Sequence, residues 1–127
     1  RHKRFEDSLG DAVRSYNNIE DKIDAILNWH FHWFESEHFE GCMFMHALSE
    51  FKQNDKRICK VAEEHKSWLC KLFVDVLDDD SQESLIRAEL MMTFLEGMIV
   101  RAEFNALGIQ RSYYREVMLR IALVRGR

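Results

Sequence analysis

One stretch of this 127-residue chain repeats its apolar side chains with the period of an α-helix. Between residues 58 and 76 the apolar positions recur three and four residues apart, and charged residues fill the positions between them. This spacing predicts an amphipathic helix of about 24 residues with a single apolar face. The face consists of Ile58, Val61, Ala62, His65, Trp68, Leu69, Leu72, Phe73 and Val76. Such a helix needs other elements to cover that face.

The remainder of the chain favours helices as well. Proline is absent and glycine occurs 5 times, so the sequence lacks the turn residues that a fold of many short strands needs. Polar breaks divide the apolar patterns, and these breaks predict about six helices. The expected helices cover residues 1–16, 19–36, 42–51, about 54–77, 81–107 and 110–124. We therefore predict one all-α domain over residues 1–127, with residues 1–16 as the end of a helix that begins upstream.

Capping residues set the expected helix ends. Asn17 or Asn18 can cap the second helix, because a side-chain oxygen there accepts from the free amides of the first turn. Asp80 is expected to cap the 81–107 helix, with Glu83 as its capping-box partner. Gly108 is expected to end that helix, because glycine readily adopts the left-handed conformation.

The 81–107 helix carries apolar residues on two faces. One stripe is Leu85, Ala88, Met92, Leu95, Ile99, Ala102 and Ala106, and the second is Ile86, Leu90, Phe94 and Met98. A helix that is apolar on two faces must bury both. One face can meet the core of this chain, and the other needs a second partner. The pattern therefore predicts a homodimer with two-fold symmetry.

Composition excludes several classes of protein. With 46% hydrophobic residues and a net charge of −4, the chain is neither disordered nor covered by a nucleic-acid-binding surface. No apolar run reaches the roughly 18 residues of a membrane helix, so we expect no membrane partner. Three cysteines make a disulfide framework improbable and indicate a reducing, cytoplasmic location. Residue 1 is Arg, which indicates a piece of a longer protein.

Six histidines among many acids raise the question of a metal site. Glu35-x-x-His38 matches half of a di-iron bundle motif, but a second copy is absent. His30 and His32 point about 200° apart on a helix and cannot share a metal. We interpret these histidines as partly exposed polar residues near a helix end. No phosphate loop or nucleophile elbow occurs, so we predict no metal, no cofactor and no enzymatic activity. A stand-alone helical-bundle metal protein or enzyme is the alternative.

An aromatic and methionine-rich set is spread over four expected helices: Trp29, Trp33, Phe44, Trp68, Phe73, Met91 and Met92. Such a set usually forms core, but large side chains that interdigitate poorly leave a ligand cavity. His65 is either a hydrogen-bonded core histidine or a polar contact in that cavity. Glu96 is either on the cavity wall or exposed.

Cys42 follows Gly41 at an expected helix start. The helix dipole there lowers a thiol pKa and makes the thiolate more reactive. Cys42 is thus a candidate redox or electrophile sensor, unless it is simply a packed apolar residue. Cys59 and Cys70 lie about 16 Å apart along one helix and cannot bond to each other.

Several motifs together resemble a known family. They are Asn17-Asn18 before a helix with Trp29-His30-Phe31-His32-Trp33-Phe34, then Phe39-Glu40-Gly41-Cys42, Ala62-Glu63-Glu64-His65 and Leu95-Glu96-Gly97. In this order they are similar to the C-terminal regulatory domain of TetR-family transcriptional regulators. The resemblance covers nearly the whole chain.

The resemblance implies an effector-binding and dimerisation domain of a repressor. The last two long helices would form a four-helix bundle with their symmetry mates, through Phe94, Met98, Val117 and Ile121. A small apolar or aromatic effector would bind among Trp29, Trp33, Phe44, Leu48, His65, Leu69, Met92 and Glu96. It would release operator DNA held by an N-terminal helix-turn-helix domain, which does not precede Arg1 in this sequence. The fragment alone is not expected to bind an operator.

Overall fold

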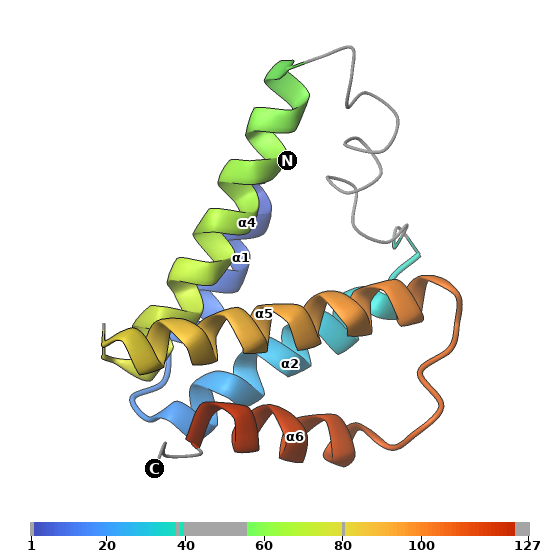
Figure 1. Ribbon diagram of the computed structural model, residues 1–127. Helices are drawn as coiled ribbons and strands as arrows, with labels where there is room; N and C mark the ends of the chain where they lie inside the picture. Colours follow the sequence, from blue (N-terminus) through green and yellow to red (C-terminus); the bar gives the residue numbers. More distant parts are fainter. Residues whose placement is uncertain (1, 38, 40–55, 80, 124–127) are drawn as a thin grey trace.

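The computed structural model describes residues 2–37, 39, 56–79 and 81–123 of the chain. Over these ranges it contains five α-helices and no strand, so the all-α prediction is confirmed. The helices are α1 (His2–Arg14), α2 (Ile19–Phe34), α4 (Lys56–Leu77), α5 (Gln82–Glu103) and α6 (Arg111–Leu123), as Figure 1 shows. The expected helix at 42–51 lies outside the described residues.

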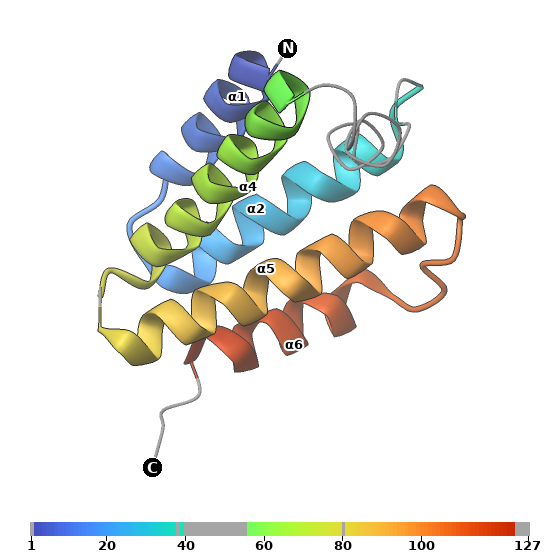
Figure 2. The ribbon, with the colours of Figure 1, turned by 45° about the horizontal axis from the view of Figure 1, so that its top comes forward.

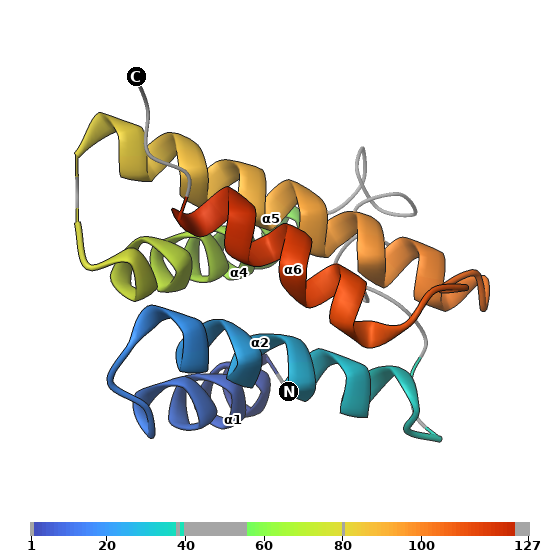
Figure 3. The ribbon, with the colours of Figure 1, turned by 90° about the horizontal axis from the view of Figure 1, so that it is seen from below.

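Helix α2 is the centre of the arrangement, because it contacts all four of the other described helices. Helices α1 and α4 lie side by side, and α5 and α6 run antiparallel along one edge of the molecule (Figures 2 and 3). The chain begins at one end of the bundle. The α1–α2 turn, the α4–α5 turn and the last residues of α6 gather at the opposite end (Figure 2).

Each described helix places a fully buried side chain in one core. These side chains are Leu9 of α1, Ile23 of α2, Phe73 of α4, Leu95 of α5 and Met118 of α6, each 0% exposed. All five belong to one cluster of buried apolar residues. The described helices therefore share one core, as expected for a single domain of this length.

The apolar face expected on α4 is confirmed where side chains are described. His65, Leu69, Phe73 and Val76 are buried, and Trp68 is half-buried. Leu72 also packs against the core from a half-buried position. Helical spacing alone therefore identified which side of this helix faces inward.

Charged contacts attach α6 to α2. Arg115 forms an ion pair with Asp24, and the guanidinium of Arg111 lies 2.8 Å from the Glu35 carboxylate. Arg111 also sits over the Phe31 ring, 4.7 Å from its centroid, a cation–π geometry. These contacts use the basic character that the sequence shows in its last segment, and they seat α6 across α2.

The start of α2 agrees with the expected cap. The Asn18 side-chain oxygen accepts a hydrogen bond of 2.8 Å from the Asp21 amide. The Asn18 amide in turn donates to the Asp21 carboxylate at 2.9 Å. Asn18, rather than Asn17, is therefore the capping residue, and its side chain satisfies one of the amides that every helix start leaves free.

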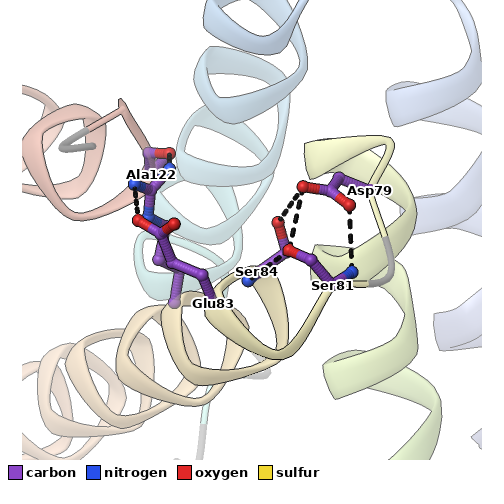
Figure 4. Close-up of polar contacts among 6 residues, drawn as sticks. Asp79, Ser81, Glu83, Ser84 and Ala122 are labelled. Atoms are coloured by element: carbon purple, nitrogen blue, oxygen red, sulfur yellow. Dashed lines mark hydrogen bonds and ion pairs between the residues drawn. The ribbon is translucent and has the colours of Figure 1, made fainter. Parts of the chain in front are cut away.

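The expected cap of α5 was wrong. Ser81, not Asp80, is the N-cap, and its hydroxyl accepts from the Ser84 amide at 3.2 Å. Asp79 supports this cap, because its carboxylate accepts from the Ser81 amide at 2.9 Å and from the hydroxyls of Ser81 and Ser84 at 2.9 and 3.0 Å (Figure 4). These hydrogen bonds hold the pKa of Asp79 below its usual value.

The expected end of α5 was also wrong. The helix ends at Glu103, and Asn105, rather than Gly108, takes the left-handed conformation with φ of 55°. The Asn105 amide donates to the Ala102 carbonyl at 3.0 Å, and the Ala106 amide donates to the Arg101 carbonyl at 2.8 Å. This pair of bonds is a Schellman motif. Asparagine tolerates the left-handed region, so it can end a helix before a glycine is reached.

Candidate functional site

The aromatic side chains expected at the ligand site lie together on α2. The ring centroids of Trp29 and Trp33 are 5.9 Å apart, and both rings are half-buried against the core. Trp33 also meets Phe39 edge to face, with centroids 4.8 Å apart. Leu69 of α4 and Met92 of α5 are buried in the same core cluster. Phe44 and Leu48, the other two apolar members of the expected site, lie outside the described residues.

Trp29 joins α2 to α1. Its indole nitrogen donates a hydrogen bond of 2.9 Å to the Ser8 hydroxyl. This hydrogen bond satisfies the indole N–H and restrains the orientation of the ring. Sequence reasoning missed Ser8, because no pattern in the sequence sets the register between the first two helices.

His30 corrects an expectation. It was grouped with the partly exposed histidines at the end of α2, yet it is 0% exposed. Its Nδ1 lies 2.7 Å from the Ile26 carbonyl. Since a carbonyl only accepts, Nδ1 carries a proton and donates to it. The signal was available, because His30 falls on the apolar stripe of α2 with Ile23 and Ile26.

Burial lowers the pKa of His30 to about 4. Loss of solvent around the ring is the largest cause, the Ile26 hydrogen bond opposes it, and the positive charge of Lys66 lowers the pKa further. The His30 ring also lies beside both tryptophans of α2, with its centroid 4.9 Å from that of Trp29 and 6.1 Å from that of Trp33.

Charged groups from three helices surround this region. His65 Nδ1 of α4 lies 3.8 Å from a carboxylate oxygen of Glu6 on α1, and the His65 side chain is 4% exposed. Lys66 Nζ lies 2.8 Å from a carboxylate oxygen of Glu96 on α5. We call Glu6, His30, His65, Lys66 and Glu96 the interior polar set.

The interior polar set comes from α1, α2, α4 and α5. Stacking of Trp68 on His65, with ring centroids 6.4 Å apart, adds another aromatic surface beside it. Where aromatic side chains and a few polar groups line a pocket, they suit an apolar or aromatic molecule that carries one polar handle. The Glu96 side chain is 38% exposed and pairs with Lys66, so both interpretations of Glu96 stay open. Glu6 and Lys66 were missed from the sequence, where both resemble ordinary surface charges.

A group of at least three His, Cys, Asp or Glu side chains able to hold a metal ion does not occur among the described residues. The Glu35-x-x-His38 half motif supplies no such group within the described residues either. The Glu35 carboxylate pairs with Arg111 at 2.8 Å, and His38 lies outside the described part of the chain.

A cavity of about 650 Å³ opens at the other end of the bundle. Residues 17–22, residues 76–78 and Leu123 line it, from the α1–α2 turn, the end of α4 and the end of α6. It contains none of the residues expected to bind a ligand, so it is separate from the aromatic region.

Large apolar side chains are exposed mainly on one part of the molecule. Among the described side chains, nine of the ten exposed large hydrophobic residues lie between residues 85 and 123. They are Leu85, Ile86, Leu90, Val100, Phe104, Ile109, Tyr113, Val117 and Leu123. We call them the α5–α6 apolar face. Large exposed apolar patches are typical of interaction sites.

The four residues expected at a dimer interface divide between surface and interior. Val117 is 41% exposed and belongs to the α5–α6 apolar face. Phe94 and Ile121 are half-buried against the core, and the Phe94 ring lies 6.4 Å from that of Tyr114. Met98 is 2% exposed and lies in the core, so its side chain cannot contribute to a surface unless α5 moves.

The two stripes expected on α5 are arranged differently from the prediction. The core side is broad, with Ala88, Met91, Met92, Leu95, Met98 and Ile99 all buried. It is broad because α5 packs against both α4 and α6. Leu85, expected on the core side, is 50% exposed, and the outer stripe is continued by Val100 and Phe104, at 47% and 75% exposed.

The candidate sensor Cys42 lies outside the described residues, as does the side chain of Cys59. Cys70 is a free thiol in a half-buried position on α4. The expectation that Cys42 reacts fastest therefore stays a prediction.

A comparison of the chain with known protein families, curated proteins and solved structures finds no match. Within the described helices, none combines the length and apolar character needed to cross a bilayer.

Proposed function

We propose that this chain is the effector-sensing and dimerisation domain of a TetR-type transcriptional repressor. In this proposal two copies associate through α5 and α6. A small apolar or aromatic effector binds among α2, α4 and α5. Operator DNA is held by a helix-turn-helix domain that would precede Arg1, joined to this domain through α1.

The observation that carries the proposal is the α5–α6 apolar face. Seven of its nine residues lie on two antiparallel, adjacent helices, and Phe104 and Ile109 lie in the connection between them. Removing such apolar surface from water gains about 25 cal/mol per Å². A second copy brings an identical surface, which a two-fold arrangement can match against the first. Two helices from each copy would then make a four-helix bundle.

The effector part of the proposal is supported by the aromatic region and its polar set. Trp29, Trp33 and Trp68 supply flat apolar surface, and His65 with Glu96 supply polar contacts. Trp29 is hydrogen-bonded to Ser8 on α1. An effector that displaces Trp29 would therefore move α1, the helix that leads toward the DNA-binding domain. This contact gives effector binding a physical route to the operator-binding half.

Thermal unfolding in the presence of small aromatic compounds tests the effector part. Indole, salicylate and naphthalene span neutral, anionic and purely apolar aromatics. A ligand that binds only the folded state raises the free energy of unfolding by about 2.7 kcal/mol when its concentration is 100 times its dissociation constant. We expect at least one compound to raise the melting temperature and quench tryptophan emission in the same concentration range. Trp29→Phe should reduce the quenching, whereas Trp68→Phe should reduce it less. Unchanged melting and emission with all three compounds would contradict an aromatic effector.

A further inference from the structure

Gly97 lies in the middle of α5, where no contact within the described part of the chain requires a glycine. Glycine in a helix interior weakens the helix relative to alanine. A Cβ placed at Gly97 meets no atom within 4 Å beyond its chain neighbours and its own helix backbone. The missing side chain therefore relieves no contact within the described chain, and Gly97 is itself exposed.

Gly97 is also at the centre of the exposed side of α5. At 100° per residue, Ile86, Leu90, Val100 and Phe104 all project within about 60° of the Gly97 direction. Each of these four side chains is exposed, at between 47% and 75%. The apolar stripe of α5 thus has its smallest residue at its midpoint, with large residues before and after it.

The stripe is self-complementary about Gly97. When two copies of one helix cross antiparallel around a two-fold axis, a residue before the axis meets the residue at the same separation after it on the partner. Leu90 precedes Gly97 by seven residues and Phe104 follows it by seven. This pairing brings two large apolar side chains together.

We propose that Gly97 is the crossing point of α5 with α5 of a second copy, with the two-fold axis passing beside it. The absent side chain lets the two backbones approach closely. Leu90 of one copy then packs on Phe104 of the partner subunit, on either side of the crossing. This inference rests on the proposed function, because it uses the same face to pair two copies.

Substitution at Gly97 tests the crossing by sedimentation equilibrium. Gly97→Leu adds apolar surface and helix propensity, so it folds, and its melting temperature at low concentration should not fall. We expect its dimer dissociation constant to rise by at least about tenfold, because the added side chain separates the backbones. Ser67→Leu, at an exposed position on α4, is the matched control and should leave the dissociation constant unchanged.

A cysteine introduced at the crossing gives an independent readout. A residue beside a two-fold axis lies near its own copy, within the roughly 4.4–6.8 Å between Cα atoms that a disulfide spans. Gly97→Cys should therefore form a covalent dimer under mild oxidation, mapped to position 97 by mass spectrometry, and Ser67→Cys should not. Two results would contradict the crossing at Gly97 while leaving the dimer intact. Gly97→Leu could dimerise as tightly as the wild type, or Gly97→Cys could form no such disulfide although the wild type is a dimer. A monomeric wild type would contradict both the crossing and the proposed dimer.

Discussion

Lys66 on α4 and Glu96 on α5 form an ion pair of 2.8 Å, and the charge of Lys66 lowers the pKa of the buried His30. The two side chains are 20% and 38% exposed, so the pair is partly screened by water. It connects two helices whose relative register no sequence pattern specifies. It also places a positive and a negative charge beside the aromatic region that the proposed effector would occupy.

A double-mutant cycle of Lys66→Met and Glu96→Gln measures this pair. Partly exposed ion pairs contribute about 1 kcal/mol or less. We expect a coupling energy in that range from urea unfolding of the wild type, both single variants and the double variant. The same cycle at Glu116 and Arg120, an exposed pair within α6, should give a smaller value. Equal values would show that the α4–α5 pair gains nothing from its position.

Acid should destabilise the domain through His30. Burial lowers the pKa of His30 to about 4 in the folded state, while the unfolded chain has the ordinary value near 6.5. The unfolded state therefore binds more protons between these two values. Stability is full above pH 6.5 and falls as the pH drops toward 4, by at most about 3 kcal/mol.

His30→Gln should remove this component, because glutamine does not titrate. The measurement is the free energy of unfolding in urea at several pH values, compared as the difference between wild type and variant. His32→Gln, at an exposed position on the same helix, is the control and should keep the wild-type dependence. If the free energy of unfolding of His30→Gln fell as much as that of the wild type between pH 6.5 and 4, other groups would cause the loss.

The cap of α5 should contribute measurably to stability. Ser81→Ala removes the hydroxyl that accepts from the Ser84 amide (Figure 4), and such losses cost about 1 kcal/mol. Arg87, which donates to the Ala122 carbonyl at 3.2 Å, continues to attach this end of α5 to α6. Thermal unfolding should therefore show a lower midpoint with one cooperative transition. A Ser112→Ala variant at the start of α6, where no cap is seen, should shift the midpoint less.

Charge on the exposed stripe should separate dimers without unfolding them. Val100→Glu places a carboxylate on the α5–α6 apolar face and should give a folded monomer, because an unpaired charge cannot be buried at the contact. Met98→Glu, two residues away, puts the same charge in the core and should cost at least about 3 kcal/mol and unfold the chain. Circular dichroism with sedimentation distinguishes the two results. If both variants remained folded dimers, the assignment of the dimer contact to the α5–α6 apolar face would be wrong.

The sequence was sufficient to predict the five described helices and much of their core. The period of α4 identified His65, Leu69 and Phe73 as inward, and burial confirms all three. The break at residues 17–18 predicted the start of α2 at Ile19, where it begins. These features depend on spacing and capping within a single helix, which is information that a local pattern contains.

The sequence was less informative where two helices meet. Met98 was expected on the outer stripe of α5, yet α4 and α6 together cover enough of that helix to bury it. Asn105 ended α5 before Gly108, since either residue can adopt the left-handed conformation and tertiary packing selects between them. The contacts of Ser8, Glu6 and Lys66 depend on how helices are set against one another, which a pattern within one helix does not encode.

The molar mass of the wild-type chain in solution tests the account most directly. Sedimentation equilibrium at micromolar concentrations should give twice the chain mass of 15.2 kDa, because in the proposed dimer a second copy covers the α5–α6 apolar face. The dimer should persist at high salt, since apolar burial rather than charge holds it. A mass of 15.2 kDa across the concentration range would contradict the account, because the exposed stripe of α5 and α6 would then have no partner of its own kind.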